Sequence, residues 1–400
     1  MRRFWLVRLV SFFFLAAALP CSALVAQQLQ PSKDIPRLES LVRVDSNDAQ
    51  LHYQLGVAYW SRKRFDDAER SFRTAIAIER RFAAGYLALS YLPYARRKQL
   101  FKEQEKGKVP PEWRDALTEA DRQRRLAFLI NPMVDLQIIG AVVPTNEGIY
   151  FGNQIVIVLD PFSAFVRGNY RTAYGIFNEW VTEQEKKKGR DSVSSGLLWF
   201  RGLSGGHIGE HATAIGDFER LLARGVSAET SSTTHGPIPL MTNDYRYILA
   251  LLNYRAGRYA ESIALYREAL GNDVGLFMAH VQMGKMYEER QQWTDAIEHF
   301  RHAVATNPDD PSLLLDLGTV LREAGNLSES ETTLRSAMSA NGRDTRVLYH
   351  LGLTLDQAGK KSEAREVFAR FLDLAPSRYN RQITDVQQRL AALQPAVSER

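Results

Sequence analysis

The sequence is poor in cysteine, and this absence removes several kinds of chemistry. Among 400 residues the one cysteine is Cys21, which lies in an N-terminal segment that we expect to be removed. The remaining chain then has no disulfide, no thiolate nucleophile and no cysteine-based metal site. Its stability must therefore come from packing of its apolar residues, which make up 45% of the sequence.

A strong charge of one sign is also lacking. The chain has 51 basic and 46 acidic residues, a formal net charge of +5. Three arginines belong to the N-terminal segment, which has no acidic residue, so 48 basic residues face 46 acidic ones after its removal. The basic runs at 96–98 and 186–188 have glutamates close by and are expected to be solvated helix faces. We therefore expect no nucleic-acid binding, which needs a concentrated basic surface.

Long apolar runs are missing except near the N-terminus. A basic end with three arginines precedes an apolar run over 9–19, and small residues follow at 21–26. This order is typical of a secretory signal peptide, so we expect residues 1–26 to be one and the protein to be periplasmic or extracellular. A retained membrane anchor is the alternative, against which Pro20 and the small residues argue.

Catalytic motifs are scarce. The sequence contains no glycine-rich phosphate loop, no serine elbow and no pair of catalytic carboxylates. The string HIGEH at 207–211 matches the H-x-x-E-H pattern of inverted zinc peptidases, which requires both histidines on one helix. Because Gly209 lies inside it at a predicted turn, we expect a structural turn instead.

His299 and His302 lie three residues apart on a predicted helix, a spacing open to a two-histidine metal site but also to packed or solvated residues. We therefore expect no enzyme, no cofactor and no metal site. A zinc peptidase or hydrolase built on the central region is the alternative.

A repeat of 34 residues is the strongest pattern that is present. Segments starting at Asn243, Phe277, Pro311 and Thr345 align without a gap. Each has an apolar residue in its seventh place and a small one in its eighth, and in its twentieth a small residue again. The small residues predict two closely packed helices per segment. Their pairs are Leu249-Ala250, Met283-Gly284, Leu317-Gly318 and Leu351-Gly352.

The pattern resembles the tetratricopeptide repeat family, whose period is 34 residues. The resemblance is fullest in the third-last unit, with Met283, Gly284, Tyr287, Trp293, Ala296, Phe300, Ala303 and Pro308. It implies an all-α fold, a right-handed superhelical solenoid of helix-turn-helix hairpins. Unrelated amphipathic helices are the alternative, but they would not keep one period over four units.

The repeat divides the chain into segments. Within the N-terminal units the closing residues of the second unit arrive late, which indicates an insertion near 93–112. The central region is irregular, and its apolar runs 138–143 and 155–159 fit short β-strands or buried helix equally. The expected segments are 1–26 signal peptide, 27–133 N-terminal units, 134–241 irregular or degenerate repeats, 242–376 four regular units, and 377–400 a capping helix and tail.

The resemblance also implies that function lies on the concave surface, which the first helix of each hairpin lines. Aromatic side chains beside mixed charges suit a groove for a polypeptide. The residues expected there are Tyr53, Trp60, Tyr247, Tyr254, Arg255, Lys285, Arg322, Tyr349 and His350.

The sequence thus predicts an exported scaffold or adaptor that binds a protein or peptide partner, in envelope assembly or a secretion-related complex. Membrane association is expected only through an uncleaved leader or through docking of 138–159. The oligomeric state is left open.

Overall fold

A computed structural model describes residues 35–100, 111–134, 149–151, 154–156, 161–166, 168–225 and 242–393. The predicted signal peptide and most of 138–159 lie outside this part. The described residues are mainly helical and adjacent helices pack as pairs, so the predicted helical-repeat fold is confirmed. In the part of the chain that is described, no helix is both long and apolar enough to span a membrane.

The four regular units form consecutive hairpins. Three of the predicted starts coincide with the first residues of helices, and the fourth lies one residue inside its helix. The pairs are α12 (Thr242–Arg255) with α13 (Tyr259–Asn272), α14 (Phe277–Glu288) with α15 (Trp293–Thr306), α16 (Pro311–Glu323) with α17 (Leu327–Ala340), and α18 (Thr345–Gln357) with α19 (Lys361–Leu374). After η3 (Ser377–Tyr379), α20 (Asn380–Ala392) covers the last hairpin and buries Val386 against it.

Small residues in the eighth place let the two helices of a hairpin approach each other. At Gly352 an added Cβ would lie 2.4 Å from Cε1 of Phe368, the aromatic residue of the facing helix. A carbon at that distance overlaps the ring. Glycine is therefore required there for packing, since the position is an ordinary helical one.

We expect Gly352→Ala to lower the free energy of unfolding of the C-terminal hairpins by about 1–3 kcal/mol, the usual cost of overfilling a packed core. Gly216→Ala is the matched control because no atom lies within 4 Å of its added Cβ. That change should stabilise α10 by up to about 1 kcal/mol, since alanine is the better helix former. Urea denaturation followed by circular dichroism measures both, and equal effects would contradict the packing argument.

The N-terminal units use the same hairpins. They consist of α1 (Ile35–Val44), α2 (Ala49–Ser61) paired with α3 (Phe65–Ile78), and α4 (Ala83–Leu100) paired with α5 (Pro111–Ile130). The predicted insertion near 93–112 includes the end of α4, which continues through Pro93 to Leu100. The buried Ala120 and Ala127 place α5 as the second helix of this hairpin.

The central region contains α7 (Pro161–Val166), α8 (Tyr170–Lys188), η2 (Arg190–Ser192) and the hairpin of α9 (Ser195–Ile208) with α10 (His211–Arg224). Two short strands, β1 (Ile149–Phe151) and β2 (Gln154–Val156), pair antiparallel with Tyr150 opposite Ile155. The first apolar run considered as a strand, 138–143, lies outside the described residues. Of the second run, 155–159, only the first two residues are described, in β2.

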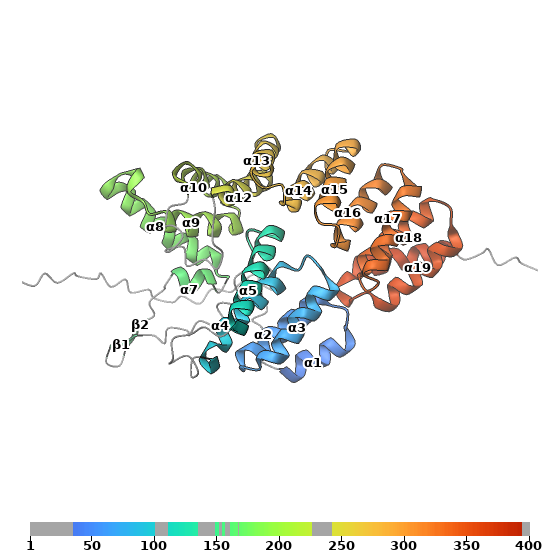
Figure 1. Cartoon of the computed structure of the whole chain (residues 1–400), viewed down its shortest axis with the longest axis horizontal. Helices are drawn as coiled ribbons and strands as arrows, with labels where there is room; N and C mark the ends of the chain where they lie inside the picture. The colour runs from blue at the N-terminus through green and yellow to red at the C-terminus, as the bar shows by residue number, and fades with distance from the viewer. Residues whose placement is uncertain are drawn as a thin grey trace, which may run out of the picture.

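The chain of hairpins curves back on itself. Figure 1 shows α1–α3, in blue, lying beside α17–α19, in red, while α5 runs toward α12 and α14 through the middle of the molecule. Hydrogen bonds join residues as far apart in sequence as Asp45 and Ser377. The N-terminal units therefore close onto the C-terminal ones.

Candidate functional site

The contact between the two ends is made by equivalent turns of the repeat. The turns at 45–48 and 77–81 precede α2 and α4, and they meet the turns at 341–346 and 374–378. We call this contact the closure seam. Asn47 Nδ2 donates to the carbonyl of Arg343 at 2.8 Å, and Asn341 Nδ2 donates to the carbonyl of Ala77 at 3.2 Å. The seam is thus built from polar groups of the turns, apart from the apolar cores of the two ends.

Arg81 is the residue of the closure seam that reaches farthest into the regular units. Its Nη1 lies 2.7 Å from Oδ2 of Asp316, and its Nη2 donates to the carbonyl of Ser312 at 2.7 Å. The side chains are only 11% and 19% exposed. Asp316 is in the sixth place of its unit, where a groove residue is expected, so this part of the groove is occupied by the chain itself.

The groove of α12 is covered in a similar way by α5 and the turn after it. The Tyr247 hydroxyl donates to the carbonyl of Leu129 at 2.7 Å, and its ring lies 5.9 Å from that of Phe128. Arg125 Nη1 lies 2.7 Å from Oδ1 of the buried Asp244. Burial raises the pKa of Tyr247 far above its usual range. The side chain of Tyr247 is therefore internal in this conformation.

The two predicted groove residues of the N-terminal unit lie within or beside its core. Trp60 is buried and its ring lies edge-on to Phe65 at 5.7 Å. Tyr53 is partly buried and packs on Phe72 and Phe82 at 5.7 and 5.4 Å. These two residues lie far along the chain from the other predicted groove residues, and their rings serve local packing.

The twelfth place of each regular unit forms a row along the first helices. The row consists of Tyr254, Glu288, Arg322 and Asp356, and we call it the groove ladder. All four side chains are partly exposed. The Tyr254 hydroxyl donates to Oε1 of Glu289 at 2.5 Å, which ties α12 to α14. Asp356 pairs with Arg389 of α20 at 2.9 Å.

Carboxylates predominate in the middle of the groove ladder. Burial raises the pKa of Glu288, and the negative charges of Asp316, Glu323 and Glu289 add to this effect. Lys285, one turn earlier on α14, is partly exposed and opposes it. A cationic group that entered here would meet a carboxylate already short of solvent and of positive charge.

The remaining predicted residues are bound to neighbouring helices. Arg255 lies beside Met133, with Nη1 3.1 Å from the sulfur, and Tyr349 donates to Oδ2 of Asp385 on α20 at 3.0 Å. His350 lies near Arg322 inside the closure seam, and burial lowers its pKa to about 4. The structure thus gathers Tyr254, Lys285 and Arg322 on one open stretch and places the others in contacts within the chain.

The string at 207–211 spans a turn. His207 belongs to α9 and His211 to α10, and Gly209 between them has a φ of +89°. His207 stacks on Tyr170 at a centroid distance of 3.8 Å, and burial lowers its pKa to about 4. Because the two histidines lie on separate helices, the arrangement of the zinc-peptidase motif is not formed.

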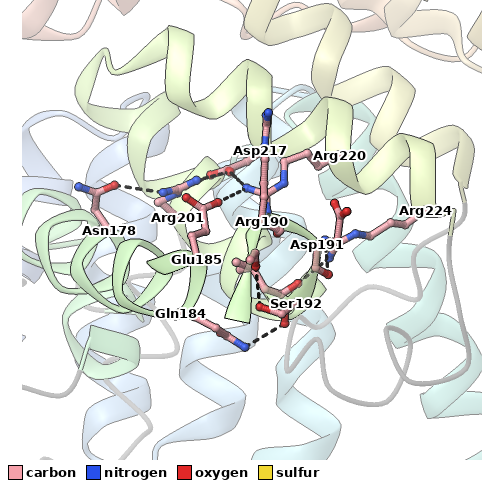
Figure 2. A network of polar contacts seen from close by, with 12 residues as sticks. Asn178, Gln184, Glu185, Arg190, Asp191, Ser192, Arg201, Asp217, Arg220 and Arg224 are labelled. Carbon is pink, nitrogen blue, oxygen red and sulfur yellow. Dashed lines mark hydrogen bonds and ion pairs between the residues drawn. The ribbon is translucent and has the colours of Figure 1, made fainter. Parts of the chain in front are cut away.

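The adjoining hairpin is braced by ion pairs. Figure 2 shows Arg201 of α9 between Asn178 and Asp217, with Arg220 reaching toward Glu185. Arg201 donates to both oxygens of Asp217 at 2.8 and 2.6 Å, and their side chains are 9% and 1% exposed. Arg201 stands in the seventh place, which is apolar in the regular units. The pair therefore replaces an apolar contact in this unit.

Sequence reasoning missed two sets of residues. Glu288 and Glu289 were detectable, since the 34-residue period places them level with Tyr254 and Arg255. Arg81 and Arg125 gave no signal, because their partners lie 235 and 119 residues away along the chain. Local patterns do not report such distant contacts.

Three family models, each described as a tetratricopeptide repeat, match the chain. One matches residues 35–84 and 208–275, another 288–349 and the third 346–377, together just over half of the chain. None of the curated proteins compared with the chain matches it.

Solved structures with similar folds are distant relatives at most. The C-terminal part of a TPR repeat-containing protein from Cytophaga hutchinsonii is 14% identical over 60% of this chain and 96% of its own, with a TM-score of 0.45. Yeast Tom70 is 12% identical over 90% of this chain and 92% of its own, with a TM-score of 0.40. YrrB, described as a TPR protein with an unusual peptide-binding site, is 21% identical over 38% of this chain and 87% of its own, with a TM-score of 0.31.

The assignment rests on the family models together with the hairpins onto which they fall. The matched ranges cover α1–α3, α10, α12–α13 and the helices from the end of α14 to α19. Both the period and the packing of small residues against aromatic ones agree with them. The chain belongs to the tetratricopeptide repeat family.

Proposed function

We propose that this protein is an exported scaffold that holds a protein or peptide partner along the open stretch of its groove. The observation that carries the proposal is the groove ladder, a row of partly exposed side chains on a rigid set of helices. Sites on packed helices keep their geometry, which favours recognition. The ladder lies beside Lys285 and the carboxylates of α14 and α16, so polar contacts would orient the partner.

The charge of the open stretch favours a partner with basic side chains. Glu288, Glu289 and Glu323 are accompanied there by Lys285 and Arg322, and Arg322 is already paired with Glu323. A lysine or arginine of the partner would relieve the repulsion among the carboxylates. Electrostatic complementarity of this kind fixes register and speeds association.

The signal-peptide pattern over 1–26 supports a place outside the cytoplasm, and we propose a role in envelope assembly or a secretion-related complex. Mass spectrometry of the mature protein from the native host tests export. An N-terminus at or before Ala26 is expected, whereas retention of Met1 in the cytoplasmic fraction would contradict export.

Site-specific photo-cross-linking tests the binding surface. A photoreactive residue replacing Tyr254 should cross-link to a partner in the intact host, and one replacing the exposed Glu366 of α19 should not. The partner so identified is then titrated with purified protein. Glu288→Lys should weaken binding by about tenfold or more, the loss expected from a like-charge contact. Equal cross-linking at both positions, or an unchanged dissociation constant, would reject the groove ladder as the site.

A further inference from the structure

Three histidines converge on the outer side of the Phe277 unit, away from the groove ladder. His280 belongs to α14, and His299 and His302 belong to α15. The ring of His280 lies 5.3 Å from that of His299 and 5.1 Å from that of His302, measured between centroids. The sequence places two of them on one helix, but the hairpin is needed to bring in the third.

The separation of two ring nitrogens matches that of metal ligands. Nδ1 of His280 lies 3.1 Å from Nδ1 of His299. Two nitrogens bound to one tetrahedral zinc ion at 2.0–2.1 Å lie about 3.3 Å apart. A metal ion could therefore replace the hydrogen bond between the rings with a shift of a few tenths of an ångström.

The surroundings hold these rings in place and leave them able to bind. His299 stacks on Tyr287 at a centroid distance of 5.4 Å and an interplanar angle of 10°. Burial lowers the pKa of His280 to about 4 and also lowers the pKa of His299, so both imidazoles are neutral at pH 7. Neutral imidazole is the form that binds metals.

The third histidine is close but not yet in position. His302 is 56% exposed, and its Nε2 lies 3.7 Å from Oε1 of Glu298. Among the described residues no group of three or more histidine, cysteine or acidic side chains is arranged to hold a metal ion as it stands. His302 must therefore rotate about its side-chain bonds, which an exposed residue does freely.

We propose that His280, His299 and His302 form a binding site for a divalent transition-metal ion of the zinc class. His280 and His299 supply two preformed Nδ1 ligands, and His302 completes the set after rotation, with water in the fourth position. Each of the first two imidazoles then carries its proton on Nε2, so the shift between tautomers releases no proton. Glu298 accepts from Nε2 of His302 and orients it, as carboxylates do behind metal-bound histidines.

Zinc titration of the full mature chain at pH 7.5 by isothermal calorimetry tests the proposal. One zinc ion per chain is expected, and cobalt should bind at the same stoichiometry with the absorption spectrum of a tetrahedral site. His280→Ala and His299→Ala should each weaken binding by about tenfold or more, since even loss of an outer partner costs that much. His302→Ala should weaken it as well.

His211→Ala is the matched control, because it removes a histidine of the HIGEH string and leaves the three-histidine site intact. It should bind zinc like the unaltered chain. Circular dichroism in EDTA shows whether each variant is folded, and zinc protection of the His280 and His299 imidazole signals in NMR gives a reading in the unaltered chain. Absence of zinc binding, binding that survives His280→Ala, or loss on His211→Ala would each overturn the proposal.

Discussion

Asp217→Ala should be among the most destabilising single changes in this protein. It leaves the guanidinium of Arg201 buried without its bidentate partner, and removal of one member of a buried ion pair costs about 3–5 kcal/mol. The effect should concentrate in α9 and α10, since each hairpin of a repeat protein contacts mainly its neighbours. Hydrogen exchange of the amides in these helices is the measurement, with faster exchange expected there.

A double variant separates the lost charge pair from lost packing. Arg201→Leu combined with Asp217→Ala puts an apolar residue in the seventh place, as in the regular units, and should recover most of the stability. Replacement of a buried pair by apolar residues is often neutral or stabilising. Glu219→Ala, an exposed position on α10, is the control and should change little. If the double variant exchanges as fast as Asp217→Ala, the pair is not a substitute for the apolar contact.

Arg81→Glu should open the closure seam. The change places a carboxylate against Asp316 in a poorly solvated contact, where like charges cost several kcal/mol. Few other interactions oppose the opening, since Arg346 with Glu79 and Arg378 with Asp48 lie at 3.6 and 3.3 Å on partly exposed side chains. Small-angle X-ray scattering should show a larger radius of gyration, and amides of the turns at 45–48 and 341–346 should exchange faster.

The charge-swapped chain is the control for this prediction. Arg81→Glu with Asp316→Arg restores the opposite charges in reverse order and should return the radius of gyration toward the original value. The hairpins from α12 to α15 should exchange at the same rate in all three proteins. An unchanged radius in Arg81→Glu would show that the closure seam does not depend on this ion pair.

The sequence predicted local structure well because repeat packing is local. Gly284, Gly318 and Gly352 each meet the side chain of the twenty-fourth residue of their own unit, 16 residues later. Such contacts leave a periodic trace that can be aligned. The same period accounts for the position of the groove ladder, including Glu288, which was not singled out.

The arrangement of the ends could not be predicted in this way. Contacts such as Arg81 with Asp316 join segments of different register, and neither residue is unusual for an exposed helix end. Tyr247, Arg255 and His350 were expected to face a partner, but their neighbours from α5 and the closure seam come from distant parts of the chain. Whether these residues also bind a partner after the seam opens stays a prediction.

The closure seam also sets an order on folding. Hairpins form from contacts within a few tens of residues, whereas the bond between Asp45 and Ser377 spans 332 residues. Joining the ends of so long a loop costs chain entropy that the local contacts do not repay until both ends are structured. The N-terminal units, synthesised first, must therefore wait for the last hairpin, and completion of the native structure is the final kinetic step.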